Sequence, residues 1–594
     1  MTNAKPQPWK LKSKAYSYFF GIGETNFLNF VFRLTKDCIS VNNTNQVNKL
    51  LRVLGHEFAM SQNPNMRKGG LIGLAAMAIG MGKESKHYVN DLVKPVLSCM
   101  DDSDSRVRFY ACESLYNVTK VAREEILHLF NDIFIAMGKV VTDLDQSVRT
   151  AAELLDRLLK DIITENVDFS TENFVPTLKA VMYTEDQFAR SFCIGWVQAM
   201  HKVPNPSIVQ HIPDIIDPLF RFLRDPRHEI YTRTQRELLV FISAITKDPP
   251  SNEDDYIIKI VNSLVEHVQS PDIRVQTMSV HWIRAFAAIS GPLLFSYISG
   301  ILMAVLPNLS YDEQKRREVS EVNYRKIRIE SKRLYMDLMK ILENEAKRLR
   351  STTNEEDLKN LAAILNVVTD ELNNGKTESK VGALKWINLL FTILNKQMAP
   401  HIDTIFPTLL KTLSDSNDEV VILDLRVLAV ICKPSGNKHF QPLMFSLYTL
   451  FKADRNLLQT KGHYILRQLS IYLSSEEIFK SLAEMLQKEE DLKFSRLLVE
   501  DLNMIMFTAK ELQGLRDSIR SLESKQSKDL FVCLYKTWSH SQAPIISLVF
   551  LAGCYSHALD LVHAISKQEM TIEFLLELDR FIQLLESPMF ARKF

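Results

Sequence analysis

The chain has 594 residues and a formal net charge of +1 at pH 7, with 46% hydrophobic and 24% charged residues. Such a composition is typical of an ordered globular protein, and it offers no excess positive charge for binding nucleic acid. With only 18 Gly and 21 Pro, the sequence favours a mostly helical chain. The seven cysteines form no CxxC pair, and none has a histidine at metal-ligand spacing, so we expect reduced thiols, no metal and no cofactor.

A glycine-rich stretch, Met66 to Ser85, reads MRKGGLIGLAAMAIGMGKES. Its Gly-Lys step does not make a phosphate-binding loop, because Met77 stands where that motif needs glycine and neither Ser nor Thr follows Lys83. The longest apolar runs, 69–81 and 545–554, are shorter than the roughly 20 residues of a membrane-spanning helix. We therefore expect membrane association to be peripheral or through partners.

A period of 41 residues organises the N-terminal half. It is marked by four arginines: Arg67, Arg108, Arg149 and Arg190. Each follows an apolar residue, and a small residue and an apolar residue come three and ten positions later, which places these positions on one face of a helix. Four residues before each arginine stands a good helix N-cap: Asn63, Asp104, Asp145 or Asp186.

A preceding helix is visible in each period, for example in YVNDLVKPVLSCM, so each unit is two helices joined by a short acidic turn. Two helices in about 40 to 47 residues are typical of HEAT or armadillo arrays. We therefore predict an all-α, HEAT/armadillo-like α-solenoid with a C-terminal helical region. The four arginines, with Asp104, Asp145 and Asp186, are interpreted as a structural ladder between repeats, and a basic stripe for a ligand is the alternative.

The pattern divides the chain into successive parts. Residues 42–310 read as HEAT repeats, and 358–433 as further HEAT-like repeats. Between them, 311–357 is strongly charged and lacks a regular apolar face, which favours a helix and solvated connector over a lipid-facing patch. The stretch CKPSGNKHF, 432–440, is the best candidate boundary, and helices without the period continue through 440–594.

Nothing in the sequence argues for catalysis. No GxSxG, HExxH or kinase-like set occurs, and the histidines lack Glu or Cys at a ligating offset. Two functions remain from the physics alone. One is a scaffold that holds partner proteins, and the other is a trafficking or transport adaptor that binds cargo peptides on its concave face.

Several stretches resemble a known family. They include MRKGGLIGLAAMAIGMGKES, VLSCMDDSDSRVRFYACESLYNVTKVAR, PTLLKTLSDSNDEVVILDLRVLA and HALDLVHAISKQEMTIEFLLELDRFIQLLESPMF. These are similar to segments of the ArPIKfyve family, the vacuole-morphology HEAT-repeat scaffold of the PIKfyve (Fab-type) lipid kinase complex. The similarity runs from about residue 42 to 590. Residues 1–41 diverge from the family's opening repeat, and the family continues through further helices beyond the point where this chain ends.

The resemblance implies a non-catalytic scaffold. It would hold the phosphatidylinositol 3-phosphate 5-kinase and the opposing Sac-type 5-phosphatase, and so regulate phosphatidylinositol 3,5-bisphosphate on endosomal, lysosomal or vacuolar membranes. In the family the N-terminal repeats engage the kinase, which corresponds here to about 67–165. The C-terminal helices, here 440–594, would engage the phosphatase and form a homo-oligomer.

Candidate contact residues follow from their positions in the matched segments. For the kinase we select residues that we expect to be exposed between the repeat cores: Lys68, Arg106, Arg123 and Asp156. For the phosphatase or self-association we select two short groups: Asp491, Lys493 and Arg496, and Tyr555, His557 and Asp560.

Overall fold

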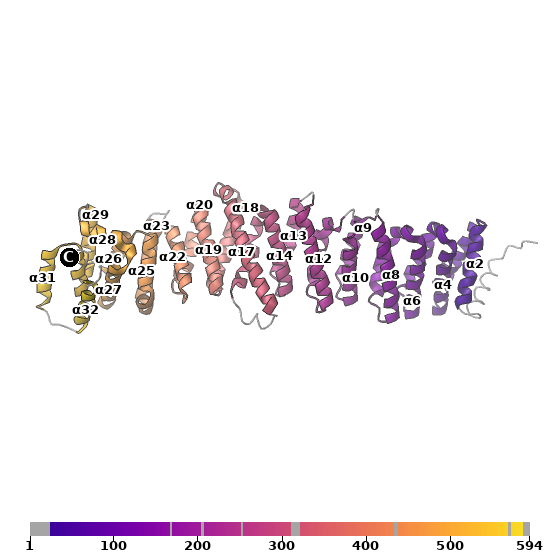
Figure 1. Cartoon of the computed structure of the whole chain (residues 1–594), viewed down its shortest axis with the longest axis horizontal. Helices are drawn as coiled ribbons and strands as arrows, with labels where there is room; N and C mark the ends of the chain where they lie inside the picture. Colours follow the sequence, from indigo (N-terminus) through magenta and orange to yellow (C-terminus); the bar gives the residue numbers. More distant parts are fainter. Residues whose placement is uncertain are drawn as a thin grey trace, which may run out of the picture. The chain divides into compact units, whose positions relative to one another are not determined.

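The computed structural model describes residues 24–166, 169–203, 207–250, 253–310, 321–432, 437–567 and 572–585 (Figure 1). Every regular element in these ranges is a helix, and successive helices pack in pairs, which confirms the predicted all-α solenoid. The chain divides into two compact units, 1–289 and 290–594. The expected divergent segment, the charged connector and the boundary at 432–440 each lie partly outside the described residues.

Unit 1 is built from two layers of helices. One layer contains α2 (Glu24–Ser40), α4 (Pro64–Met81), α6 (Ser105–Ala122), α8 (Gln146–Glu165), α10 (Gln187–Met200), α12 (His228–Lys247) and α14 (Ile273–Ile289). The other contains α3 (Thr44–Arg52) with its continuation η1 (Val53–Phe58), α5 (Val89–Cys99), α7 (Phe130–Val140), α9 (Thr171–Met182), α11 (Ile212–Phe222) and α13 (Glu253–Val268). The predicted N-caps are confirmed: Asn63, Asp104, Asp145 and Asp186 each accept a hydrogen bond from the first turn of the following helix.

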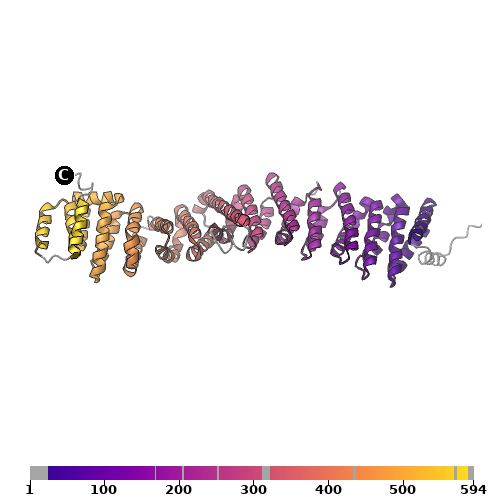
Figure 2. The same cartoon turned by 60° about the horizontal axis from the view of Figure 1, so that its bottom comes forward.

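Unit 2 repeats the arrangement (Figure 2). One layer contains α17 (Glu321–Arg350), α19 (Thr377–Ile393), α22 (Asp418–Cys432), α25 (His463–Tyr472), α27 (Leu492–Thr508) and α30 (Gln542–Leu551). The other contains α15 (Ile298–Val305), α18 (Glu355–Asn374), α21 (Ile402–Thr412), α23 (Asn437–Ala453), α26 (Ser475–Leu486) and α29 (Lys525–Trp538). The remaining helices are α20 (Asn395–Met398), α24 (Arg455–Leu457), α28 (Gln513–Ser521), α31 (Tyr555–Ile565) and α32 (Ile572–Leu585).

Helix α17 corrects one interpretation of the sequence. The charged stretch that contains it was expected to lack a regular apolar face, yet α17 buries Tyr324, Ile327, Leu334 and Leu338 at helical spacing. This face packs against α15 and α19. The dense charges on its other faces hid the apolar stripe, which needs only about three residues in every two turns.

One stretch of unit 2, Gly291–Leu309, is long and apolar enough to cross a membrane by length and composition alone. It folds as three short pieces, the 3₁₀ segments η5 (Gly291–Tyr297) and η6 (Leu306–Leu309) on either side of α15. Half of it is buried inside the protein, where α15 packs against α17 and α18. This burial is typical of a core helix in a solenoid.

The glycines of α4 are explained by its packing between α2 and α6. A Cβ atom on Gly70 would lie 2.5 Å from the backbone nitrogen of Ala59 and 2.8 Å from the carbonyl oxygen of Leu54. Both atoms belong to the chain around η1, so this approach of backbone to helix requires glycine. Gly82 ends the helix with a φ of +55°, which glycine adopts without strain.

We predict that Gly70→Ala lowers the free energy of unfolding by about 2 kcal/mol, because the new methyl group meets backbone atoms that cannot rotate away. Urea denaturation of the full chain measures this change. Gly138→Ala in α7 is the matched control, because its Cβ would make an ordinary 3.4 Å contact with Val181. That variant should be neutral or stabilising by up to about 1 kcal/mol, and equal destabilisation by both changes would contradict the explanation.

Candidate interaction surfaces

An arginine ladder connects successive repeats of unit 1. Arg67 Nη1 donates to the carbonyl oxygens of Ser61 and Gln62 in its own turn, each at 2.9 Å. Its Nη2 donates to Asp102 in the next turn, at 2.8 Å. Arg108 repeats this pattern one repeat later, donating to the Asp102 carbonyl at 2.7 Å and to Asp143 Oδ1 at 2.9 Å. Each guanidinium thus joins two neighbouring turns.

The acidic members of this ladder differ from those expected. Asp104, Asp145 and Asp186 cap their own helices, and the arginines bond instead to aspartates that stand 35 residues after each arginine: Asp102, Asp143 and Asp225. The register follows the 41-residue period, but it begins two residues before each cap. The acidic turn was visible in the sequence, and the choice between its two aspartates needed the structure.

Arg149 is the exception, because position 184 holds threonine where the period calls for aspartate. Its guanidinium bonds within its own turn to Gln146 and to the carbonyl of Leu144, and it lies 5.0 Å from the ring centre of Phe188. A cation–π contact therefore takes the place of the ion pair. The same 35-residue spacing returns in unit 2, where Lys380 Nζ lies 2.8 Å from Asp415.

Ion pairing sets the protonation of the ladder carboxylates. Burial by itself would raise the pKa of Asp143, whose side chain is only 5% exposed. Hydrogen bonds from Arg108 and from the backbone N–H of Asp145 outweigh burial and lower that pKa below its ordinary value. Burial and the bond from Lys380 act on Asp415 in the same opposed way, and its pKa is also lowered. Both groups therefore stay ionised and paired.

We predict that Arg108→Ala lowers the free energy of unfolding by about 3 kcal/mol, because it leaves the buried Asp143 carboxylate without its ionic partner. The measurement is urea denaturation of the full chain. Arg106→Ala removes an arginine from the same helix, but one whose side chain is 70% exposed, and it should leave the unfolding midpoint unchanged. Equal effects of the two changes would show that the ladder does not stabilise the stack.

The lowered pKa of Asp143 gives a pH dependence of known sign. The native state binds the proton more weakly than the unfolded state, so the stabilisation is present above about pH 4 and is lost as pH falls through the native pKa. Asp143→Asn abolishes this titration. We expect wild type to be more stable than Asp143→Asn at pH 6, with the difference shrinking toward pH 3 in urea midpoints. A difference that stays constant with pH would contradict the assignment.

Two of the four residues selected for kinase contact are engaged inside the protein. Asp156 was expected to be exposed, but its side chain is only 16% exposed and accepts hydrogen bonds from Lys160 at 2.5 Å and from the Trp196 indole at 2.8 Å. Lys68 is half-buried, with its Nζ 4.6 Å from the ring centre of Tyr110. The selection was wrong about their exposure because both lie on helix faces covered by the next repeat.

The other two residues are exposed. Arg106 pairs with Asp104 at 2.9 Å, next to the helix cap. Arg123 lies at the end of α6, 41 residues after Gly82, and has a similar positive φ of +50°, pairing with Glu165 at 2.9 Å. These two side chains can be reached by a partner, but they stand at opposite ends of α6.

The structure places the C-terminal candidates on two helices. Asp491 caps α27 and pairs with Arg455, while Lys493 and Arg496 are exposed on the same helix. Tyr555, His557 and Asp560 are exposed on α31, and His557 Nε2 lies 2.8 Å from the Tyr535 hydroxyl. Of these residues, Asp491 has a clear structural task as a cap.

Apolar side chains that the sequence analysis missed stand exposed beside α31. Tyr555, Leu559 and Val562 recur at helical spacing along one face of that helix, each more than 40% exposed. The following helix α32 exposes four more large apolar side chains: Ile572, Leu575, Leu576 and Ile582. An exposed apolar surface of this kind marks a site of protein association. The signal in the sequence was the i, i+4, i+7 spacing.

A second missed surface is a groove between α6 and α8 in unit 1. It encloses about 490 Å³ and is lined by the aromatic rings of Phe109 and Tyr116 and by Leu154, with polar side chains around them. Leu154 is 52% exposed. Aromatic and aliphatic side chains in a recess are the usual anchors of a protein interface. Among the described residues no cluster of His, Cys, Asp and Glu could hold a metal ion.

Comparison with known proteins places these surfaces in context. A family model described as the Vacuolar 14 Fab1-binding region matches residues 65–161. A second model, for the C-terminal region of Vacuolar protein 14 that binds the Sac-type phosphatase, matches residues 455–593. A protein VAC14 homolog of Arabidopsis thaliana is 37% identical over 560 residues, covering 94% of this chain and 72% of the relative. The chain belongs to the VAC14 family.

More distant VAC14 proteins match over the same extent. The VAC14 homolog of Schizosaccharomyces pombe is 29% identical and covers 94% of this chain and 79% of its own length. Vacuole morphology and inheritance protein 14 of Saccharomyces cerevisiae is 25% identical and covers 94% of this chain and 77% of its own length. These matches confirm the resemblance seen in the sequence. The groove between α6 and α8 lies within the first matched segment, and α31 with α32 lies within the second.

Proposed function

We propose that the chain is a non-catalytic scaffold that holds a phosphatidylinositol 3-phosphate 5-kinase together with the opposing Sac-type 5-phosphatase. The observation that carries the proposal is the presence of two separate matched segments in one chain, one for binding the Fab1 kinase and one for binding the phosphatase. They fall in different structural units, so both partners can bind one chain through different residues. Tethering two enzymes in this way raises their effective concentration toward each other and toward a shared lipid.

Each matched segment contains one surface suited to its partner. In the N-terminal segment, about 67–165, the proposed kinase contact is the groove lined by Phe109, Tyr116 and Leu154. In the C-terminal segment, 440–594, the proposed phosphatase and self-association contact is the exposed apolar face of α31 and α32. Exposed charges near these surfaces, Arg106 and Arg123 for the kinase, would steer and orient the partner more than they add affinity.

The proposed place of action is the cytoplasmic surface of endosomal, lysosomal or vacuolar membranes, with the scaffold bound peripherally. Support comes from the name of the yeast relative, a vacuole morphology and inheritance protein. In this arrangement the lipid chemistry belongs to the bound enzymes. The scaffold would regulate phosphatidylinositol 3,5-bisphosphate by keeping the enzymes that make and remove its 5-phosphate on one frame.

We predict that Leu154→Asp reduces recovery of the kinase in co-precipitation by at least about fivefold, because a charge in the groove removes its apolar anchor. Recovery of the phosphatase should not change. Leu144→Asp is the matched control, since Leu144 is 98% exposed in the same segment and does not line the groove. Loss of the kinase from both variants, or from neither, would contradict the groove as its contact.

A further inference from the structure

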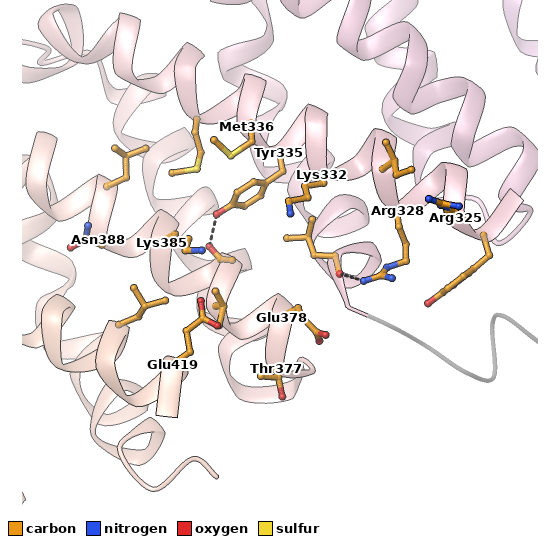
Figure 3. A pocket seen from close by; sticks show the side chains of 18 of the residues that line it. Arg325, Arg328, Lys332, Tyr335, Met336, Thr377, Glu378, Lys385, Asn388 and Glu419 are labelled. Carbon is orange, nitrogen blue, oxygen red and sulfur yellow. Dashed lines mark hydrogen bonds between the residues drawn. The ribbon is translucent and has the colours of Figure 1, made fainter. Parts of the chain in front are cut away.

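A large groove in unit 2 lies outside both matched segments (Figure 3). It encloses about 1100 Å³ and is formed by side chains of α17, α19 and α22, three successive helices of one layer. Its apolar part consists of Ile329, Met336, Met339, Leu389 and Leu423. Ile329 and Met336 are 42% and 48% exposed, and methionine is well suited to surfaces that adapt to a bound chain.

Basic side chains surround this apolar part: Arg325, Arg328 and Lys332 from α17, Lys385 from α19 and Arg426 from α22. Arg328 Nη2 donates to the carbonyl of Leu309 at 3.1 Å. The other four form no ion pair with any residue in the described part of the chain, and all four are exposed. Other cations of α17 are paired, as Arg333 is with Glu330 at 3.0 Å.

The acidic residues of the groove have an internal task that the basic ones lack. Glu321, Glu378 and Glu419 stand in the first turns of α17, α19 and α22, where a negative charge stabilises the helix. A basic residue follows each of them by seven positions: Arg328, Lys385 and Arg426. Seven residues are about 10 Å along a helix. The cations therefore form a row across the groove, set apart from the acidic helix ends.

The spacing within this row sets the ligand. Neighbouring packed helices lie about 8–10 Å apart, so the row presents one cation roughly every 10 Å across three helices. An extended chain advances about 3.3 Å per residue and can place an acidic side chain near each cation at every third residue. The Asn388 side chain also lines the groove, and its buried Oδ1 accepts no hydrogen bond. A backbone N–H of a bound chain would satisfy that acceptor.

We propose that this groove binds a short segment of a partner protein that carries acidic side chains about 10 Å apart beside apolar ones. The apolar floor and the three glutamates disfavour a highly phosphorylated small molecule, which would need a more uniformly basic site. The groove is independent of the kinase and phosphatase surfaces. Its occupant is a third partner, recognised at the middle of the chain.

The test is panning of a phage library of random peptides, roughly 12 residues long, on the immobilised full chain. Selected peptides are then labelled, and their affinity is measured by fluorescence anisotropy. We expect sequences rich in Glu or Asp and apolar residues, whose affinity falls at least about tenfold in the double variant Lys385→Glu with Arg426→Glu. Met336→Asp should weaken them as much, because it places a charge in the apolar floor.

Lys326→Glu is the matched control, because Lys326 is exposed on α17 and does not line the groove. It should leave affinity unchanged, and all variants should keep the thermal melting curve and the kinase and phosphatase recovery of wild type. The proposal is overturned if no selected peptide depends on Lys385 and Arg426, or if the selected peptides are basic. It is also overturned if inositol hexakisphosphate binds with the same dependence, or if Met336→Asp changes the oligomeric mass in light scattering.

Discussion

Contact between one helix pair and the next is the interaction on which the rest of this structure depends. Each pair buries its apolar face only against its neighbours, so no repeat is stable without the stack. The arginine ladder adds direction to these apolar contacts. Arg67 and Arg108 each bond to carbonyls of their own turn and to an aspartate of the following turn, which fixes how far one repeat can rotate over the next.

The sequence predicted what repeats and missed what forms between repeats. The 41-residue period was sufficient for the helical pairs, the N-caps and the ladder arginines, because helix periodicity and capping are local properties. The ladder aspartates were assigned two residues too late, since Asp102 and Asp104 are equivalent by spacing alone. The buried state of Asp156 and both grooves depend on side chains from different helices, which no local pattern brings together.

A solenoid of this kind suits a scaffold because its surfaces are far more extensive than a globular domain of equal length would offer. In this chain the N-terminal matched segment, the central groove and the C-terminal apolar helices use different repeats, and each can change without altering the others. A ladder residue such as Arg108 and a groove residue such as Leu154 lie in neighbouring helices with separate tasks. Stability and partner binding can therefore be separated by mutation.

The central claim is that one chain holds the kinase and the phosphatase at the same time. The most direct test is sequential affinity purification from a mixture of the purified chain, a tagged kinase and a differently tagged phosphatase. Elution from the first tag followed by capture on the second should recover all three proteins, and omission of the chain should abolish recovery of the second enzyme. Recovery of only one enzyme at a time with the chain would contradict the account.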